Sequence, residues 1–436
     1  MGQPTPVMSS DQARTTKMRR GVLFASSLGN FVEWFDFTLY GYTASVIALT
    51  FFPPGNKTAA LLGTFAVYGV AFIARPLGAV VFGRIGDRRG RRSSLSLSII
   101  LMGAATAVMG ILPGWSSAGV LAPVLLLGCR LVQGFSAGGE YTGALTFTVE
   151  HAPDNRRALY MGLVGSSTML GAVGATGVAL VFRSAFGDRF AVDGWRWMFV
   201  LAGVVALVGL VVRLRVDESP VFEEMRERAA KVPARPFREL VRGHWRTLLV
   251  LFVYFAVLGL LTHMFLGYLP TYLSEAIGMP AGTVLALTTA ANLVSLPVAL
   301  TLCVLADRHG RRIQIRLGAI AAVVLIVPAY LLIATGGLAA VVTALLAFVF
   351  AVSLLQMGAL SVLELYPTSV RFSGMALPYN LAYAVFGGTA PLVSELLVDG
   401  TGALIAPAIY ASVVALIALP VLLKGIPETK GTSLRA

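Results

Sequence analysis

Residues 83–92 read GRIGDRRGRR and residues 303–312 read CVLADRHGRR, so the spacing D-R-x-G-R-R occurs twice, 220 residues apart. A second polar pattern repeats in the same register, because E-x-x-P-x-x-x-R occurs at residues 150–157 and again at residues 364–371. Two loops that match in register indicate an internal duplication. The sequence therefore predicts two similar halves, each built from the same order of elements.

The composition limits what those halves can be. Of the 436 residues, 57% are hydrophobic and only 13% are charged, whereas soluble domains are nearer 45–50% apolar and about 25% charged. A soluble chain with so few charges could not cover its surface, and this excludes an ordinary cytosolic enzyme, a disordered protein and a disulfide scaffold. The composition predicts a polytopic membrane protein.

Apolar stretches of the length of the bilayer follow the repeat. A spanning helix needs about 20 mostly apolar residues. Twelve stretches meet this length: residues 20–50, 59–83, 94–112, 119–149, 157–183, 195–214, 247–273, 281–305, 313–334, 337–363, 372–398 and 402–423. We predict an all-α membrane protein with twelve transmembrane helices in two pseudo-symmetric six-helix bundles. Its expected parts are a tail at 1–19, a bundle at 20–214, a linker at 215–246, a second bundle at 247–423 and a tail at 424–436.

Basic residues predict the orientation of these spans. With the N-terminus inside, 28 of the 34 Lys and Arg lie in the inner loops and tails and four lie in the outer loops. The positive-inside rule then places both termini in the cytoplasm, in a plasma membrane of bacterial type. The net charge of +13 is explained by these topology signals, because no aromatic residues interleave with a basic patch as in nucleic-acid binders.

At this point the chain resembles the major facilitator superfamily, for which G-x-x-x-D-R-x-G-R-R between the second and third helices is a signature. Within it, the chain is similar to the metabolite:proton symporters, such as those for proline/betaine, alpha-ketoglutarate and citrate. The segments that carry this likeness are GNFVEWFDF (29–37), RPLG (75–78), RLVQGFSAGGEY (130–141), DESPVF (217–222), ELYPTSVR (364–371), YNLA (379–382) and FGGTAP (386–391), and more weakly YLPTYL (268–273). The resemblance implies the fold of that superfamily and proton-driven uptake of small carboxylates or zwitterions by alternating access.

Charges inside the spans provide an independent argument. A charged side chain at a helix centre costs about 2.5–3.5 kcal/mol, so each needs a partner or a water-filled cavity. With a rise of 1.5 Å per residue, Asp36 in the first span and Arg130 in the fourth lie at the same depth near the midplane. Glu33 lies one turn below Asp36 on nearly the same face. We therefore expect Asp36, Glu33 and Arg130 to form a proton and substrate site, with Gln133 on the same stripe as Arg130.

Arg75 and Glu140 form a second predicted layer, because their heights above the inner face are about the same. We expect this layer to be a gate or a structural ion pair. The Asp36–Arg130 pair has a structural alternative too: a permanent ion pair that holds the first predicted helix against the fourth.

Further candidates follow from polar groups near the midplane and from the loops. His263 could bind substrate or carry a proton, or be a neutral histidine bonded to a neighbour. Tyr40, Tyr379 and Asn380 could orient substrate or serve packing. The resemblance implies that Asp87 and Arg91 stabilise the outward-facing state through charge contacts with helix ends. The candidate residues of a conformational loop, in the two repeated loops, are Gly83, Asp87, Arg88, Gly90, Arg91, Asp307, Arg308 and Arg311.

The predicted Asp36–Arg130 pair, with Glu33 beside it, could couple protons to a metabolite. Burial makes a carboxylate hold its proton more tightly, and a nearby Arg has the opposite effect. A substrate carboxylate that takes the guanidinium in a bidentate fork would free Asp36 or Glu33 to gain a proton. The neutralised site could then close without burying a bare charge. We therefore expect a monomeric symporter with protons as the coupling ion and with neither cofactor nor metal.

Particular sequence features argue against rival functions. A proton antiporter, an exporter or an uncoupled facilitator could use the same fold, although residues 158–194 contain no proline, unlike the antiporter signature of the resembled family. A membrane-embedded enzyme would need a metal cluster or an activated nucleophile, and the four scattered histidines provide neither. An ion channel would need repeated filter loops, which the sequence lacks.

Overall fold

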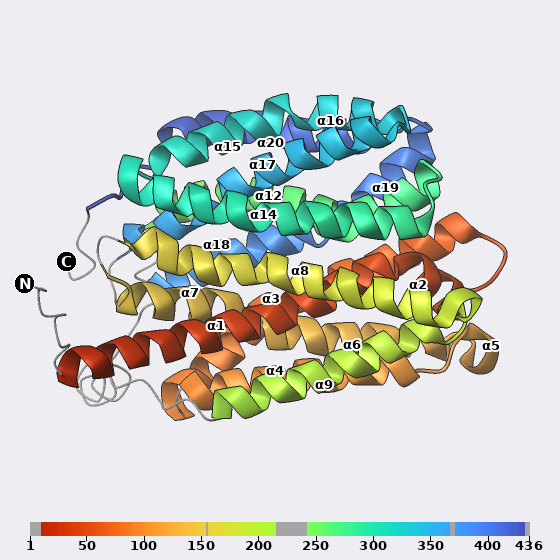
Figure 1. The fold of residues 1–436 in the computed structure, drawn as a ribbon, viewed down its shortest axis with the longest axis horizontal. Helices are drawn as coiled ribbons and strands as arrows, with labels where there is room; N and C mark the ends of the chain where they lie inside the picture. The colour runs from red at the N-terminus through yellow and green to blue at the C-terminus, as the bar shows by residue number, and fades with distance from the viewer. Residues whose placement is uncertain (1–9, 90, 154–155, 215–241, 367–370, 432–436) are drawn as a thin grey trace, which may run out of the picture.

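The computed structural model describes residues 10–89, 91–153, 156–214, 242–366 and 371–431. Its regular elements in these ranges are helices alone. Figure 1 shows two groups of helices lying side by side along one direction, one from the first half of the chain (red to yellow-green) and one from the second (green to blue). The all-α, two-bundle architecture predicted from the sequence is confirmed.

The elements of the first half are α1 (Ser10–Tyr42), α2 (Ala44–Phe51), α3 (Lys57–Arg89), α4 (Arg91–Ile111), α5 (Trp115–Ala118), α6 (Leu121–Ala137), α7 (Glu140–His151), α8 (Arg157–Phe186), the 3-10 helix η2 (Gly187–Ala191) and α9 (Gly194–Leu214).

The elements of the second half are α12 (Trp245–His263), the π-helix η3 (Met264–Tyr268), α13 (Leu269–Thr271), the π-helix η4 (Tyr272–Ala276), α14 (Ala281–His309), α15 (Arg312–Val324), α16 (Ile326–Ala334), α17 (Leu338–Val362), the 3-10 helix η5 (Leu363–Leu365), α18 (Arg371–Ala382), the π-helix η6 (Tyr383–Gly387), α19 (Ala390–Thr401) and α20 (Ala406–Lys424).

Eleven helical stretches among the described residues are long and apolar enough to cross a membrane. Each overlaps one of the predicted spans. The first predicted span, 20–50, folds into α1 and α2 but is outside this set, and it carries Asn30, Glu33 and Asp36 among its apolar residues. Most of the predicted linker, residues 215–241, lies outside the described residues.

Several spans predicted as single helices are interrupted along their length. The span 119–149 breaks at Gly138 and Gly139, between α6 and α7. The seventh span passes from α12 into two π-helical turns, and the eleventh passes from α18 into η6. Single π-turns inside α-helices are rare and occur often at functional sites. The residues around these interruptions are therefore candidates for a functional site.

Polar side chains lie inside the bundle and large apolar ones lie outside it. Ile111 and Ile417 are 73% and 74% exposed, whereas Arg75 and Arg130 are 1% or less exposed. This is the reverse of a water-soluble protein and suits a hydrocarbon surrounding, in which apolar surface needs no cover.

Glycines allow α3 and α6 to pack backbone against backbone. A Cβ added to Gly134 would lie 1.7 Å from the carbonyl oxygen of Ala71, and one added to Gly78 would lie 1.8 Å from that of Phe135. Neither position has room for a side chain unless the helices separate. This close approach brings Arg75 of α3 and Arg130 of α6 into one region beside α1.

Gly134→Ala should therefore destabilise the protein, by at least the 1–3 kcal/mol typical of overpacking, because the added methyl meets backbone that cannot rotate away. Thermal unfolding of the protein in detergent measures the effect. Gly128→Ala is the matched control on the same helix, since a Cβ there has open space around it. Equal melting temperatures for the two variants would contradict the proposed contact.

Candidate functional site

Asp36 of α1 lies in a polar network built entirely by the first half. Its carboxylate accepts hydrogen bonds from Thr106 Oγ1 at 2.7 Å and from Gln133 Nε2 at 3.0 Å. Arg130 Nη1 lies 3.5 Å from its Oδ2. All four side chains are buried. The expected Asp36–Arg130 pair is therefore present, with Thr106 of α4 as a partner that the sequence reasoning missed.

Arg130 is held by more than this carboxylate. It donates to Gln133 Oε1 at 2.8 Å, and its guanidinium carbon lies 4.3 Å from the ring centre of Tyr40 and 4.7 Å from that of Phe37. The hydroxyl of Tyr40 donates to the carbonyl of Thr64. Tyr40 and Gln133 thus fix the guanidinium in place in this conformation, by stacking and by a hydrogen bond.

Glu33 makes a different ion pair from the one expected. Its Oε1 lies 2.7 Å from Arg75 Nη2, and both side chains are buried. The Arg75 guanidinium also lies 4.4 Å from the ring centre of Phe72 and 4.8 Å from that of Phe37. The prediction that Glu33 shares a layer with Asp36 and Arg130 is corrected. A step of three residues along α1 turns the side chain by about 60° as well as raising it, so Glu33 meets α3 rather than α6.

The predicted Arg75–Glu140 layer is also wrong in its partners. Glu140, the first residue of α7, pairs with Arg213 near the end of α9, with Arg213 Nη1 2.5 Å from Glu140 Oε1. Ser98 of α4 donates to the other oxygen. The sequence reasoning compared heights along the helices and ignored the direction in which each side chain points. Arg213, at the end of the predicted span 195–214, was not among the predicted site residues, although it is buried.

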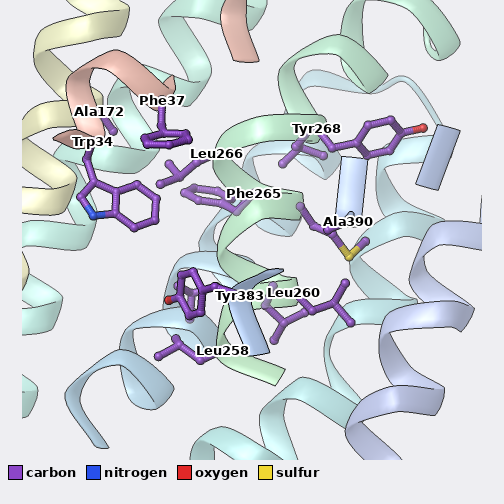
Figure 2. Close-up of a cluster of buried hydrophobic side chains, with 14 of the residues drawn as sticks. Trp34, Phe37, Ala172, Leu258, Leu260, Phe265, Leu266, Tyr268, Tyr383 and Ala390 are labelled. Carbon is purple, nitrogen blue, oxygen red and sulfur yellow. The ribbon is translucent and has the colours of Figure 1, made fainter. Parts of the chain in front are cut away.

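The second half contributes an aromatic wall opposite these charges. His263 ends α12, and its ring centre lies 4.7 Å from that of Phe72 and 5.3 Å from that of Tyr383. Tyr379 and Tyr383 are neighbours, with ring centres 4.2 Å apart. Figure 2 shows Trp34 and Phe37 of α1 projecting toward Leu266 and Phe265, with Tyr383 nearby. Phe72 contacts both Arg75 and His263, so it joins the charged layer to this wall.

Contacts close the bundle at the end where α1 begins and α20 ends, called here the terminal end (left in Figure 1). The Asp307 carboxylate accepts the backbone N–H groups of Ala158 and Leu159 at 3.1 and 3.0 Å, at the start of α8. Nearer the site, Asn380 donates to the carbonyl of Gly138 at 3.0 Å. Each contact joins the two halves. Asp307, from the second copy of the repeated loop, thus caps a helix of the opposite half.

Glu364 strengthens this closure. Its carboxylate lies 3.6 Å from Arg157 and 3.0 Å from Arg311, which come from opposite halves. Burial raises the pKa of Glu364, and Thr429, Arg311 and Arg157 oppose the shift. Near the C-terminus, partial burial acts to raise the pKa of Glu428, but the backbone N–H groups of Arg311, Lys430 and Arg312 outweigh it and hold that pKa below its ordinary value.

The first copy of the loop lies partly outside the described residues. Gly83 is half-buried in α3. Gly90, and the side chains of Asp87, Arg88 and Arg91, lie outside the described residues. In the second copy, Arg308 contributes its carbonyl, which accepts from Lys430 Nζ at 2.6 Å.

At the opposite end, called here the far end (right in Figure 1), the two halves approach closely backbone to backbone. A Cβ on Gly69 would lie 2.9 Å from the carbonyl oxygen of Gly388, and one on Gly41 would lie 3.1 Å from Gly267. One ion pair, Lys57 with Glu275 at 2.5 Å, also joins the halves there. With both ends closed and its charged groups buried, the site is occluded.

No described cluster of three or more His, Cys, Asp or Glu side chains could hold a metal ion. The site offers ion pairs, single hydrogen-bonding groups and aromatic faces. Such an arrangement can bind a small charged molecule and exchange protons.

A polytopic helical bundle in two pseudo-symmetric halves, with an occluded charged centre, is the architecture of a secondary transporter. The family model described as Major Facilitator Superfamily matches residues 26–391, and the chain belongs to this family. It is a multi-pass membrane transporter and not an enzyme.

Relatives and solved structures agree with this assignment. The chain is 34% identical over 422 residues to a putative proline/betaine transporter of Staphylococcus haemolyticus, covering 95% of this chain and 89% of that protein. It is 33% identical over 413 residues to the proline/betaine transporter of Escherichia coli, covering 92% and 82%. The xylose transporter XylE from Escherichia coli, in a partially occluded inward open conformation, matches with a TM-score of 0.75 at 19% identity, covering 96% and 100%. This last likeness concerns the fold alone.

Glu140→Gln should destabilise the protein by about 3–5 kcal/mol, because it leaves the Arg213 guanidinium buried without its counter-charge. Adding Arg213→Met should recover much of that loss, since it removes the orphaned charge. Unfolding followed by tryptophan fluorescence in detergent measures all three variants. A double variant that loses as much stability as the two single variants combined would show that the two residues act independently.

Proposed function

We propose that this transporter carries out proton-coupled uptake of a small zwitterion that bears a carboxylate, by alternating access. The observation that carries the proposal is the Glu33–Arg75 ion pair, buried in an occluded centre where Phe72 brings it next to the second half. A charge pair at this place can exchange partners with a molecule that enters between the halves.

Glu33 is the better candidate for the proton carrier of the two carboxylates on α1. Asp36 accepts two hydrogen bonds besides its contact with Arg130, and these stabilise its ionised form. Among the described residues, Glu33 has Arg75 as its only ion-pair partner, and no other group donates to its oxygens. Loss of Arg75 would thus leave Glu33 as a bare charge, which a proton neutralises.

The coupling step follows from this exchange. A substrate carboxylate takes the Arg75 guanidinium, for which a bidentate fork is the strong geometry. Glu33 then binds a proton, so neither carboxylate is left as a bare charge when the halves move, and the cationic nitrogen of the substrate is the one charge that aromatic faces must stabilise. Release of substrate returns Arg75 to Glu33 and expels the proton. Arg130 and Asp36 hold α1 against α6 during this cycle.

Two further considerations support a zwitterion. The relatives are named for proline and betaine, which each carry a carboxylate and a cationic nitrogen. At Arg75, the carboxylate of a zwitterion replaces the carboxylate of Glu33. The cationic end of the zwitterion then needs aromatic faces, and the wall of His263, Tyr379 and Tyr383 lies opposite. We place the monomeric protein in a bacterial plasma membrane with both termini in the cytoplasm, as the distribution of Lys and Arg favours.

Glu33→Gln should abolish accumulation driven by an imposed proton gradient while leaving exchange of labelled for unlabelled substrate. Proteoliposomes loaded at one pH and diluted into another, with labelled proline and glycine betaine, measure both. Asp36→Asn is the comparison variant. Retained accumulation in the Glu33 variant together with loss in the Asp36 variant would move the proton site to Asp36. Substrate entry without alkalinisation outside would indicate a facilitator, and acidification would indicate an antiporter.

Arg75→Gln should weaken binding of these zwitterions at least about tenfold, corresponding to 1.4 kcal/mol, because the carboxylate loses its charged partner. The shift in melting temperature against ligand concentration measures binding without transport. Arg246→Gln is a matched control, since Arg246 is exposed at the start of α12. Unchanged affinity in the Arg75 variant would remove this residue from the site.

A further inference from the structure

His263 lies at the centre of a cluster of aromatic rings from both halves. Its ring centre is 4.7 Å from that of Phe72, 5.3 Å from Tyr383, 5.6 Å from Trp34 and 6.0 Å from Tyr68. The side chain is 0% exposed. Two of these rings come from α3, one from α1 and one from η6, so the imidazole is enclosed where the two halves meet.

Hydrogen bonding determines which ring nitrogen of His263 carries the hydrogen. Nδ1 lies 2.8 Å from the carbonyl oxygen of Gly259. A carbonyl can only accept, so Nδ1 donates. In surroundings of aromatic rings and backbone the neutral imidazole is favoured, and its Nε2 is then a bare acceptor. In the described part of the chain, Nε2 has no hydrogen-bond partner.

A buried acceptor without a partner requires an explanation, because nearly all such groups in proteins are satisfied. The nearby Nε1 of Trp34 is also without a hydrogen bond among the described residues. Polar atoms that remain free at the meeting of two halves are those that a bound molecule would satisfy.

The position of Arg75 determines which end of a substrate would reach His263. The Phe72 ring centre lies 4.4 Å from the Arg75 guanidinium carbon and 4.7 Å from the His263 ring centre. The two groups are therefore no further apart than these two distances combined, which a small amino acid can bridge. A carboxylate on Arg75 places the adjacent nitrogen toward His263.

We propose that His263 Nε2 accepts a hydrogen bond from an N–H group of the substrate's cationic nitrogen, while the faces of Trp34, Phe72 and Tyr383 stabilise its positive charge. This inference rests on the proposed uptake of a zwitterion and specifies which zwitterions the site prefers. A primary or secondary amino acid offers the N–H. A quaternary ammonium offers the charge alone and leaves Nε2 unpaired. His263 thus makes the transporter prefer N–H zwitterions to fully methylated ones, as sites built around a hydrogen bond reject ligands that lack it.

The test compares proline with glycine betaine in proteoliposomes under one imposed proton gradient. His263→Phe keeps an aromatic ring and removes the acceptor. We expect kcat/KM for proline to fall at least about tenfold and that for glycine betaine to change less than about threefold. Trp34→Leu removes a π face and should reduce uptake of glycine betaine at least as much as uptake of proline.

His263→Asn provides the second variant, because its amide oxygen can still accept and should retain more proline uptake than His263→Phe. Melting temperatures of the purified variants show that each is folded. Equal losses for both substrates in His263→Phe, or no loss for either, would overturn this inference while the proposed function stands. Wild-type protein that accumulates neither zwitterion would overturn the proposed function and this inference together.

Discussion

The structure depends on the cost of burying charge in helix α1. Glu33 and Asp36 lie three residues apart inside the bundle, and an unpaired charge there costs several kcal/mol. Because the two side chains point in different directions, they need guanidinium partners from different helices, Arg75 of α3 and Arg130 of α6. This requirement holds α1, α3 and α6 together, and glycine contacts such as Gly134 with Ala71 let the last two approach closely enough.

The two halves contribute unlike chemistry to the centre. Buried ion pairs at mid-bundle come from the first half, where Glu33, Asp36 and Glu140 each meet an arginine of their own bundle. The second half contributes aromatic rings and π-helical turns around His263. The two pseudo-symmetric halves therefore differ in chemistry. The first half contains the buried ion pairs and the proposed proton site, and the second half offers aromatic ring faces and the His263 acceptor to an organic cation.

Depth along a helix could be predicted from the sequence, and direction around it could not. The Asp36–Arg130 pair was predicted because both lie near mid-span, and the repeated loops predicted the two bundles. The partner predicted for Arg75 was wrong, since equal heights do not make two side chains face each other. Arg213 was missed because a basic residue near a helix end has the same pattern as a topology signal. The π-helical turns η3 and η6 could not be predicted, because apolar periodicity does not distinguish them from α-helix. The hydrogen bonds of Asp307 to the start of α8 join the two halves, and a local sequence pattern does not predict such contacts.

The far end joins Gly69 to Gly388 and Gly41 to Gly267 with no side chain between the backbones. These backbone contacts involve no side-chain rotamers, so they can separate and form again without rearrangement of side chains. Separation at the terminal end must instead break helix capping by Asp307 and the bonds of Glu364 and Asn380. Opening the terminal end therefore breaks several buried polar contacts, whereas opening the far end separates backbone contacts and one partly exposed ion pair, Lys57 with Glu275.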